Sequence, residues 1–332
     1  MRPASEARET EGDRETEGER ERRDEETKAS ANATMLRLMA HVGEIAGLAT
    51  ACLWAISSFL WASVGKKTSV FGVNGFKALV GCILVTIAAF LVTKRAWPLL
   101  TTAQLATLVA SGVIGLALGD AYYFTALMSL GPRRALVLGL LAAPLSAVLG
   151  MVVLGEKISP CGWMGMALTL AGIALVQLET TQGGPERVHL VRGMLGGLGG
   201  AVAQAIASAM NKDVLKAGVS ELHVPQVRLA AAAVAILIIA LGARKCGAWF
   251  GPFREKRMAG MAFAATCLGT ALGLVLMTVS QKHASIGVSN TLTSTAPLFA
   301  LPIAVIVKRE RLSARAWIAT LIAVGGVALM FV

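Results

Sequence analysis

Three ionisable residues interrupt long apolar stretches of this sequence. Lys77 lies seven residues into the second stretch, Asp120 lies about eight residues before the end of the third, and Arg228 lies near the start of the seventh. A charge at the centre of a membrane helix costs about 2.5–3.5 kcal/mol, so residues of this kind are functional candidates. Arg228 is close enough to the start of its stretch to extend its charge into water.

Lys77 and Asp120 belong to consecutive stretches that would run antiparallel as helices. Both would then lie at a similar depth, about 10–12 Å from the same membrane face at the helical rise per residue. One interpretation is a structural ion pair between the two helices. The other is that Asp120 takes up a proton or binds a cationic group of a substrate. Further aromatic and polar residues could line a cavity or make ordinary interhelical contacts, namely Trp54, Tyr122, Tyr123, Gln204, Asn290 and Thr293.

Two prolines and two glutamates stand at comparable places in the two halves of the chain. Pro144 and Pro297 interrupt apolar stretches. Proline removes one backbone hydrogen bond, and lipid tolerates this only where neighbours or water satisfy the freed carbonyl. We therefore expect kinks that could line a pathway or serve as gates. Glu156 and Glu310 follow these stretches beside basic residues, where helix capping is favoured over a coupling role.

The composition predicts the elements that hold these residues. Hydrophobic residues make up 55% of the 332 residues and charged residues only 15%, with a mean hydropathy of +0.66. Soluble domains carry about 25% charged residues, and a helix needs about 20 residues to cross the hydrocarbon core. We expect an all-α membrane protein with ten transmembrane helices, near 44–64, 70–92, 104–128, 134–154, 160–178, 191–211, 225–243, 258–281, 286–307 and 313–332.

The charged residues are distributed unevenly along the chain. Residues 1–34 hold eleven acids and seven Lys or Arg without large apolar side chains, which predicts a disordered tail. Met35 is an alternative natural start. Beyond the tail, basic residues flank the apolar stretches, where they anchor helices and set their orientation, so no nucleic-acid partner is expected. The cysteines and histidines show no metal-ligand spacing, so we expect neither a metal nor a cofactor.

The second half of the chain repeats the first. A constant offset of 154 relates Glu156, Ser159, Trp163 and Gly172 to Glu310, Ser313, Trp317 and Gly326, and an offset of 153 relates Ala-Pro-Leu at Pro144 to the same triplet at Pro297. Five helices per copy is an odd number, so the two copies would enter the membrane in opposite directions. Inverted repeats are common in transporters, which bind substrate at the repeat interface. The predicted parts are a tail (1–43), a first repeat (44–178), a linker (179–190) and a second repeat (191–332).

Four motifs of the first repeat resemble a known family. They are Asp-Ala-Tyr-Tyr-Phe-Thr-Ala-Leu from Asp120, Ala-Pro-Leu around Pro144, Leu-Gly-Glu-Lys-Ile-Ser around Glu156 and Gly-Ile-Ala-Leu-Val from Gly172. Together they resemble the EamA domain of the drug/metabolite transporter superfamily, over roughly residues 44–332, with a weaker copy in the second repeat. The resemblance implies a ten-helix carrier with a central cavity that exports amino acids or other small metabolites, often with proton exchange.

The repeat and the resemblance together predict a secondary-active transporter of the inner (plasma) membrane. We expect it to export a small metabolite such as an amino acid, with protons as a coupling partner, by alternating access at the repeat interface. Uptake is the alternative direction. A membrane scaffold and a membrane-embedded enzyme are the rival classes, and the sequence has no HExxH motif or nucleophile elbow for an enzyme. Besides the lipid bilayer and the substrate, a second copy of the chain is a further possible partner.

The orientation in the membrane has two opposing indications. Ten helices place both termini on the same side, and the family resemblance implies the cytoplasm. With that orientation, however, fifteen Lys or Arg flank the outer helix ends and seven flank the inner ends. This runs against the positive-inside tendency. Fluorescence of a green fluorescent protein fused after Val332 would indicate the cytoplasm, whereas activity of an alkaline phosphatase fused there would indicate the opposite side.

Overall fold

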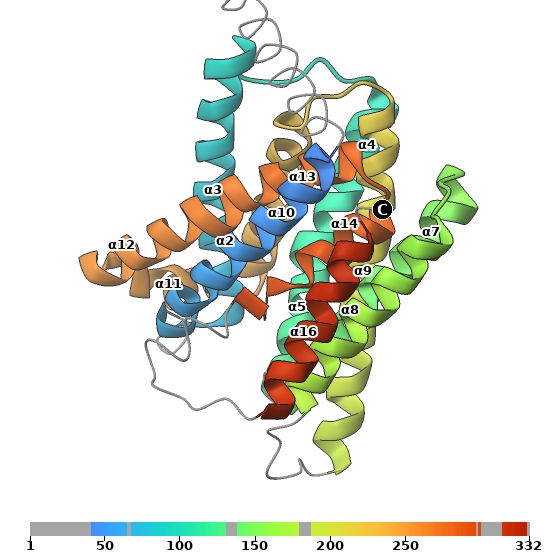
Figure 1. Cartoon of the computed structure of the whole chain (residues 1–332). Helices are drawn as coiled ribbons and strands as arrows, with labels where there is room; N and C mark the ends of the chain where they lie inside the picture. Colours follow the sequence, from blue (N-terminus) through green and yellow to red (C-terminus); the bar gives the residue numbers. More distant parts are fainter. Residues whose placement is uncertain are drawn as a thin grey trace, which may run out of the picture. The chain divides into compact units, whose positions relative to one another are not determined.

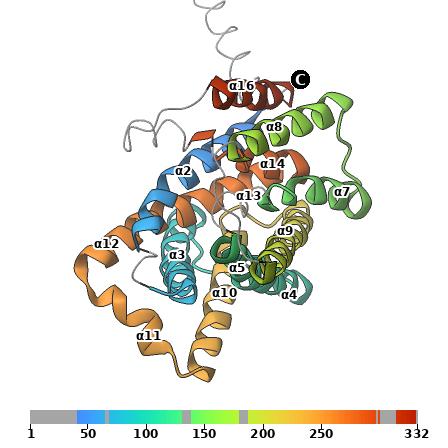
Figure 2. The ribbon, with the colours of Figure 1, turned by 90° about the horizontal axis from the view of Figure 1, so that it is seen from below.

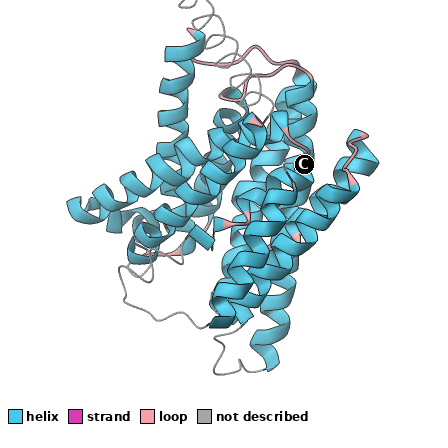
Figure 3. Ribbon diagram, in the orientation of Figure 1, coloured by secondary structure: helices cyan, strands magenta, loops and turns pink. Residues whose placement is uncertain are grey.

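The structure is a computed structural model of the chain, and it describes residues 41–64, 68–130, 138–178, 187–296, 298–299 and 314–330. The tail 1–34, Met35, Pro297 and Glu310 lie outside these ranges, as does most of the predicted linker. Within these ranges the chain is helical and contains no strand (Figure 3).

The labelled helices in the described part of the first half form the following runs, and the third of these runs contains a π-helix. They are α2 (Val42–Val64); α3 (Val70–Thr93); the run of α4 (Thr102–Ser111), η1 (Gly112–Gly119) and α5 (Asp120–Leu130); α7 (Ala142–Leu154); and α8 (Pro160–Leu178). The π-helix is η1, and it makes α4 and α5 parts of one continuous run (Figure 1).

The described helices of the second half follow the same order, with the short α11 and η2 added between the second and third runs. Its helices are α9 (Arg187–Lys216); α10 (His223–Gly242); the short α11 (Cys246–Phe250) and η2 (Gly251–Arg254); the run of α12 (Lys256–Ala265), π-helix η3 (Thr266–Leu272) and α13 (Gly273–His283); α14 (Ile286–Thr293); and α16 (Ala314–Leu329).

Six described runs are long and apolar enough to cross a membrane, namely Val42–Trp61, Val70–Thr93, Thr102–Tyr123, Leu190–Lys216, His223–Gly242 and Lys256–His283. Shorter apolar helices cover Ala142–Leu154, Pro160–Leu175 and Trp317–Leu329. Each of the ten predicted stretches contains at least one described helix. The helical class is therefore confirmed, and the count of ten crossings stays a prediction.

Helix α3 illustrates why these stretches suit lipid. Its N-terminus is capped by Ser69, whose hydroxyl accepts a hydrogen bond from the Gly72 amide at 3.1 Å. An apolar stripe with four-residue spacing is exposed along the helix, at Leu79, Ile83, Ile87 and Leu91. Small residues such as Ala78 and Ala89 are buried instead. Large apolar residues thus face outward and small ones face the neighbouring helices, as helix packing in lipid favours.

The helices α8 and α16 pack side by side and antiparallel (Figure 2). A Cβ added to Gly165 would lie 2.7 Å from the Gly326 carbonyl oxygen, and one added to Gly172 would lie 2.6 Å from the Ala319 carbonyl oxygen. Residues 165 and 319 are 154 positions apart, as are residues 172 and 326. The repeat offset therefore exchanges these two contacts, as a two-fold relation between the helices requires.

Replacing Gly326 with leucine should sharply reduce the folded yield of the protein. A Cβ at this position would lie 2.5 Å from the Thr169 backbone nitrogen, so α8 and α16 would have to separate. The neighbouring Gly325 has no atom within 4 Å of such a Cβ, and Gly325→Leu is the matched control. The monodisperse fraction after detergent extraction measures the effect. Equal yields of the two variants would contradict the packing described above.

A second antiparallel pair consists of α3 and α10. Before the start of α3, the Thr68 hydroxyl donates a hydrogen bond at 3.3 Å to the carbonyl of Trp249, which lies beyond the end of α10. At the end of α3, the Thr93 hydroxyl lies 3.4 Å from the ring of His223, the first residue of α10. The second and seventh predicted helices, α3 and α10, which correspond in the two halves, therefore run in opposite directions.

Candidate functional site

The structure brings Lys77 and Asp120 together. The Lys77 ammonium on α3 donates a hydrogen bond to the Asp120 carboxylate, and the two form an ion pair. Their side chains are 20% and 27% exposed. Asp120 is the first residue of α5, directly after η1. The pair therefore joins the second helix to the middle of the third helical run.

Arg228 lies in the same region, and the expectation that it reaches water is wrong. The residue is only 1% exposed. Glycine allows the close helix contact that encloses it, since a Cβ on Gly112 would lie 2.5 Å from the Arg228 carbonyl oxygen. The side chain passes beside Gly115, where a Cβ would lie 3.0 Å from Nη2. The position of Arg228 near the start of its helix does not reveal that the residue contacts η1.

Arg228 is also incompletely bonded. Within the described residues, neither its Nε nor its Nη2 has a hydrogen-bond partner, although both atoms are buried. The guanidinium interacts electrostatically with Asp120. We call Lys77, Asp120 and Arg228 the charge cluster. Two cations and one carboxylate give it a formal charge of +1, with residues contributed by both halves of the chain.

The π-helices η1 and η3 lie at corresponding positions in the two halves of the chain. They begin at Gly112 and Thr266, which are 154 positions apart. π-helical turns are rare and frequently occur at functional sites. In η3, the Gly269 carbonyl accepts a hydrogen bond from the Trp54 indole at 2.9 Å. Neither segment was predicted from the sequence, since both are as apolar as a membrane helix requires and η3 holds a single glycine, as do α12 and α13 on either side of it.

The fourth and ninth helical runs are interrupted at corresponding points as well. Turns lie at Leu140–Leu141 and at Ser294–Thr295, again 154 positions apart. Pro144 lies in the first turn of α7, directly after the first interruption. Proline at 144 offers no N–H to the Leu140 carbonyl, which instead accepts a hydrogen bond from the Ala143 amide at 3.2 Å. The turn precedes Pro144, and the expected kink or gate at this proline stays a prediction.

Six fully or almost fully buried side chains form a hydrogen-bonded chain between five helices, in the order Ser111, Asn211, Gln281, Ser208, Asn290 and Ser146. We call this set the polar chain. Its contacts range from 2.6 Å, between Asn290 and Ser146, to 3.2 Å. It joins α4 and α7 of the first half to α9, α13 and α14 of the second. Of these six residues only Asn290 is among the candidates predicted from the sequence, because an isolated polar residue does not reveal its partners.

Glu156 and Lys212 form a buried pair at the end of the bundle where α14 begins. The Lys212 ammonium lies 3.5 Å from the Glu156 carboxylate and donates hydrogen bonds to the carbonyls of Lys282 and Ala284, at 3.1 and 2.8 Å. Glu156 also accepts a hydrogen bond at 2.9 Å from the amide of Ile286, the first residue of α14. A carboxylate near a helix N-terminus interacts favourably with the helix dipole. Glu156 thus caps a helix of the other half.

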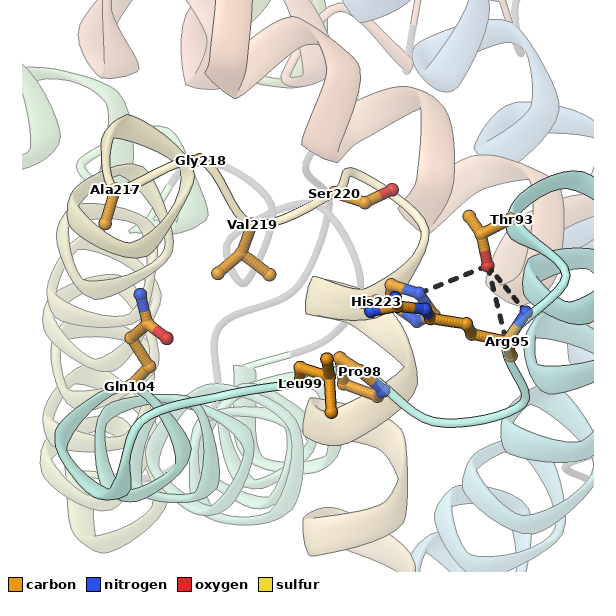
Figure 4. Close-up of a pocket in the computed structure, with 10 residues that line it drawn as sticks. All are labelled: Thr93, Arg95, Pro98, Leu99, Gln104, Ala217, Gly218, Val219, Ser220 and His223. Atoms are coloured by element: carbon orange, nitrogen blue, oxygen red, sulfur yellow. Dashed lines mark hydrogen bonds between the residues drawn. The ribbon is translucent and has the colours of Figure 1, made fainter.

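A pocket of about 520 Å³ opens near the same end, between the α3–α4 and α9–α10 connections (Figure 4). Its lining includes Arg95, Gln104, Ser220 and His223. None of these was a predicted site residue. Thr93, which also lines the pocket, is sixteen residues along α3 from Lys77, or about 24 Å at the helical rise. The pocket is therefore separate from the charge cluster.

Comparison with known proteins agrees with the repeat. A model of the EamA-like transporter family matches residues 41–178 and, a second time, residues 191–332. The chain belongs to the EamA-like transporter family. The predicted family is therefore confirmed, and with it a multi-pass membrane protein from a family of transporters rather than enzymes.

Solved structures share the fold of this EamA-like transporter. One crystal structure matches with a TM-score of 0.72 and 20% identity, over 86% of this chain and 95% of the other. At that identity the likeness concerns the fold alone. No curated protein matches the chain.

The remaining predicted residues of the EamA-like transporter occupy varied positions. Trp54 donates to η3, as described above, and the Thr293 hydroxyl donates a hydrogen bond to the Asn290 carbonyl at 3.1 Å. Tyr122 is 49% exposed and packs against Gly199. Tyr123 interacts electrostatically with Asp120, and Gln204 is partly buried on α9. Of this group, only Asn290 belongs to the polar chain and only Tyr123 interacts with the charge cluster.

Proposed function

We propose that this protein is a secondary-active transporter that exports a small metabolite across the inner (plasma) membrane by alternating access. In this proposal its ten transmembrane helices form two inverted repeats, 44–178 and 191–332, with the substrate site between them. The observation that carries the proposal is the placement of irregular backbone. Both π-helices and both helix interruptions occur in pairs at the repeat offset.

Two antiparallel helix pairs support the inversion. The pairs α3 with α10 and α8 with α16 each join helices that correspond in the two halves. A direct repeat would place such helices parallel. In inverted-repeat transporters, one repeat rocks against the other around a site near the midplane, often at discontinuous helices.

The irregular backbone favours a carrier over a membrane scaffold. Non-helical backbone at membrane depth is tolerated only where it is buried in protein or lines a water-filled cavity. The turns at Leu140–Leu141 and Ser294–Thr295 are two such places, and the two π-helices, although hydrogen-bonded, are of a kind that frequently occurs at functional sites. A scaffold has no use for these features, whereas a carrier can use them to bind solutes and to bend helices. Asp120 is the carboxylate of the charge cluster, which makes it our choice for a proton-coupling residue.

The export direction is tested by comparing the culture media of cells with and without the protein. Cells that produce it should accumulate one or a few small metabolites in the medium, measured by untargeted mass spectrometry. Accumulation per amount of folded protein in the membrane should be abolished in Asp120→Asn, while the exposed Asp213→Asn on α9 should not change it. Accelerated depletion of a metabolite from the medium would indicate uptake. Unchanged medium, with folded protein present in the membrane, would contradict transport.

A further inference from the structure

The geometry of the charge cluster points to the class of solute that this transporter carries. We infer that the solute is an organic anion, and that its carboxylate or phosphate group binds the free edge of Arg228. The inference rests on the proposed function, because it assigns the substrate of the same site.

The charge cluster carries a net positive charge. Lys77 and Asp120 neutralise each other in their ion pair, which leaves the Arg228 charge without a bonded counter-ion among the residues described. Arg228 is also 1% exposed. A buried charge is normally paired and hydrogen-bonded, because removing one partner of a buried pair costs several kcal/mol. An anionic solute would supply the missing partner, whereas a cationic solute would meet a net positive site.

The two nitrogens of Arg228 that lack a partner within the described residues are Nε and Nη2. Nε and Nη2 lie on the same edge of the guanidinium plane, and their N–H groups point in the same direction. This edge can donate two parallel hydrogen bonds to a carboxylate or a phosphate. Both atoms are buried and without a partner in the described part of the chain. The edge is thus suited to an oxyanion rather than to a carbonyl or hydroxyl group, which would use one donor only.

The backbone beside Nη2 also bears on the assignment. Gly115, within η1, lies beside Nη2, and a Cβ at that position would lie 3.0 Å from the nitrogen and 2.7 Å from the Ala207 Cβ on α9. The contact between η1 and α9 is therefore tight here, and glycine places no side chain of η1 against the nitrogen. Asp120 follows in the same helical run and pairs with Lys77.

The test uses the purified full chain in detergent and measures its melting temperature with matched solutes. Succinate, its diamide and 1,4-diaminobutane share a four-carbon skeleton but differ in charge, and a phosphate monoester, inorganic phosphate and chloride complete the panel. We expect saturable stabilisation by at least one organic anion and none by the diamide or diamine. Arg228→Lys should weaken the apparent affinity at least tenfold, since lysine cannot form the bidentate contact. The exposed Arg257→Lys is the control.

The wild-type protein keeps the test decisive if Arg228→Lys fails to fold, because succinate, its diamide and the diamine differ in charge on one carbon skeleton. Stabilisation by the diamine or the diamide alone, by chloride or inorganic phosphate alone, or equally in wild type and Arg228→Lys would overturn the inference. Export of a neutral or cationic metabolite would also overturn it while leaving the proposed function intact. Anion binding without any transport would instead contradict the proposed function.

Discussion

Asp120→Asn should cause a large loss of folded protein, because it removes the carboxylate that pairs with the half-buried Lys77 ammonium. Breaking a buried ion pair on one side costs about 3–5 kcal/mol, and the 20% and 27% exposure of the two side chains places this pair towards the lower end. Lys77→Met should have a smaller effect, since Asp120 still interacts with Arg228. The folded yield is measured as the monodisperse fraction after extraction.

The double variant Asp120→Asn/Lys77→Met distinguishes pairing from independent effects. Removing both partners leaves neither stranded, so the double variant should lose less than the sum of the two single losses. Asp213→Asn, on an exposed position of α9, controls for the loss of a carboxylate. Additive losses would reject a stabilising pair. Full folded yield of Asp120→Asn with loss of pH-driven transport would show that Asp120 serves proton coupling and does not stabilise the fold.

Glu156→Leu should produce the second large effect, a marked fall in thermal stability. Glu156 and Lys212 are only 7% and 9% exposed, and Lys212 also bonds two carbonyls at the end of α13. The leucine variant leaves the Lys212 ammonium without a carboxylate and the Ile286 amide without its acceptor. Glu156→Gln should fall between wild type and leucine, because it can still accept the amide hydrogen bond.

The adjacent exposed Lys157→Met is the matched control for this effect. Its melting temperature should stay close to that of the wild type, since surface substitutions usually change stability by about 0.5 kcal/mol or less. If Glu156→Leu melted like Lys157→Met, then Glu156 would not be joining α7 to α14 as the contacts indicate.

Features set by hydropathy and helical rise could be predicted from the sequence. The second stretch was expected at 70–92 and forms Val70–Thr93, because a lipid-crossing helix must be apolar throughout. The equal depth of Lys77 and Asp120 followed from counting residues along two antiparallel helices, and depth was sufficient to anticipate their contact.

Features set by helix rotation and close packing could not be predicted in this way. Arg228 was assigned to the water boundary from its place near a helix end, but the glycines of η1 bring α10 close enough to enclose it. The π-helices change only which carbonyl each amide bonds, and hydropathy carries no signal for that change. The polar chain depends on which serine faces which amide across five helices, as with Ser208 and Asn290.

Counterflow in proteoliposomes tests the central claim, a carrier that moves an organic anion past the charge cluster. Liposomes that contain the purified protein are loaded with an unlabelled organic anion and diluted into a trace of the same compound in labelled form. We expect transient accumulation of label above that in protein-free liposomes, lost in Arg228→Gln and retained in Arg257→Gln. No accumulation of any organic anion, from protein that remains folded after reconstitution, would contradict it.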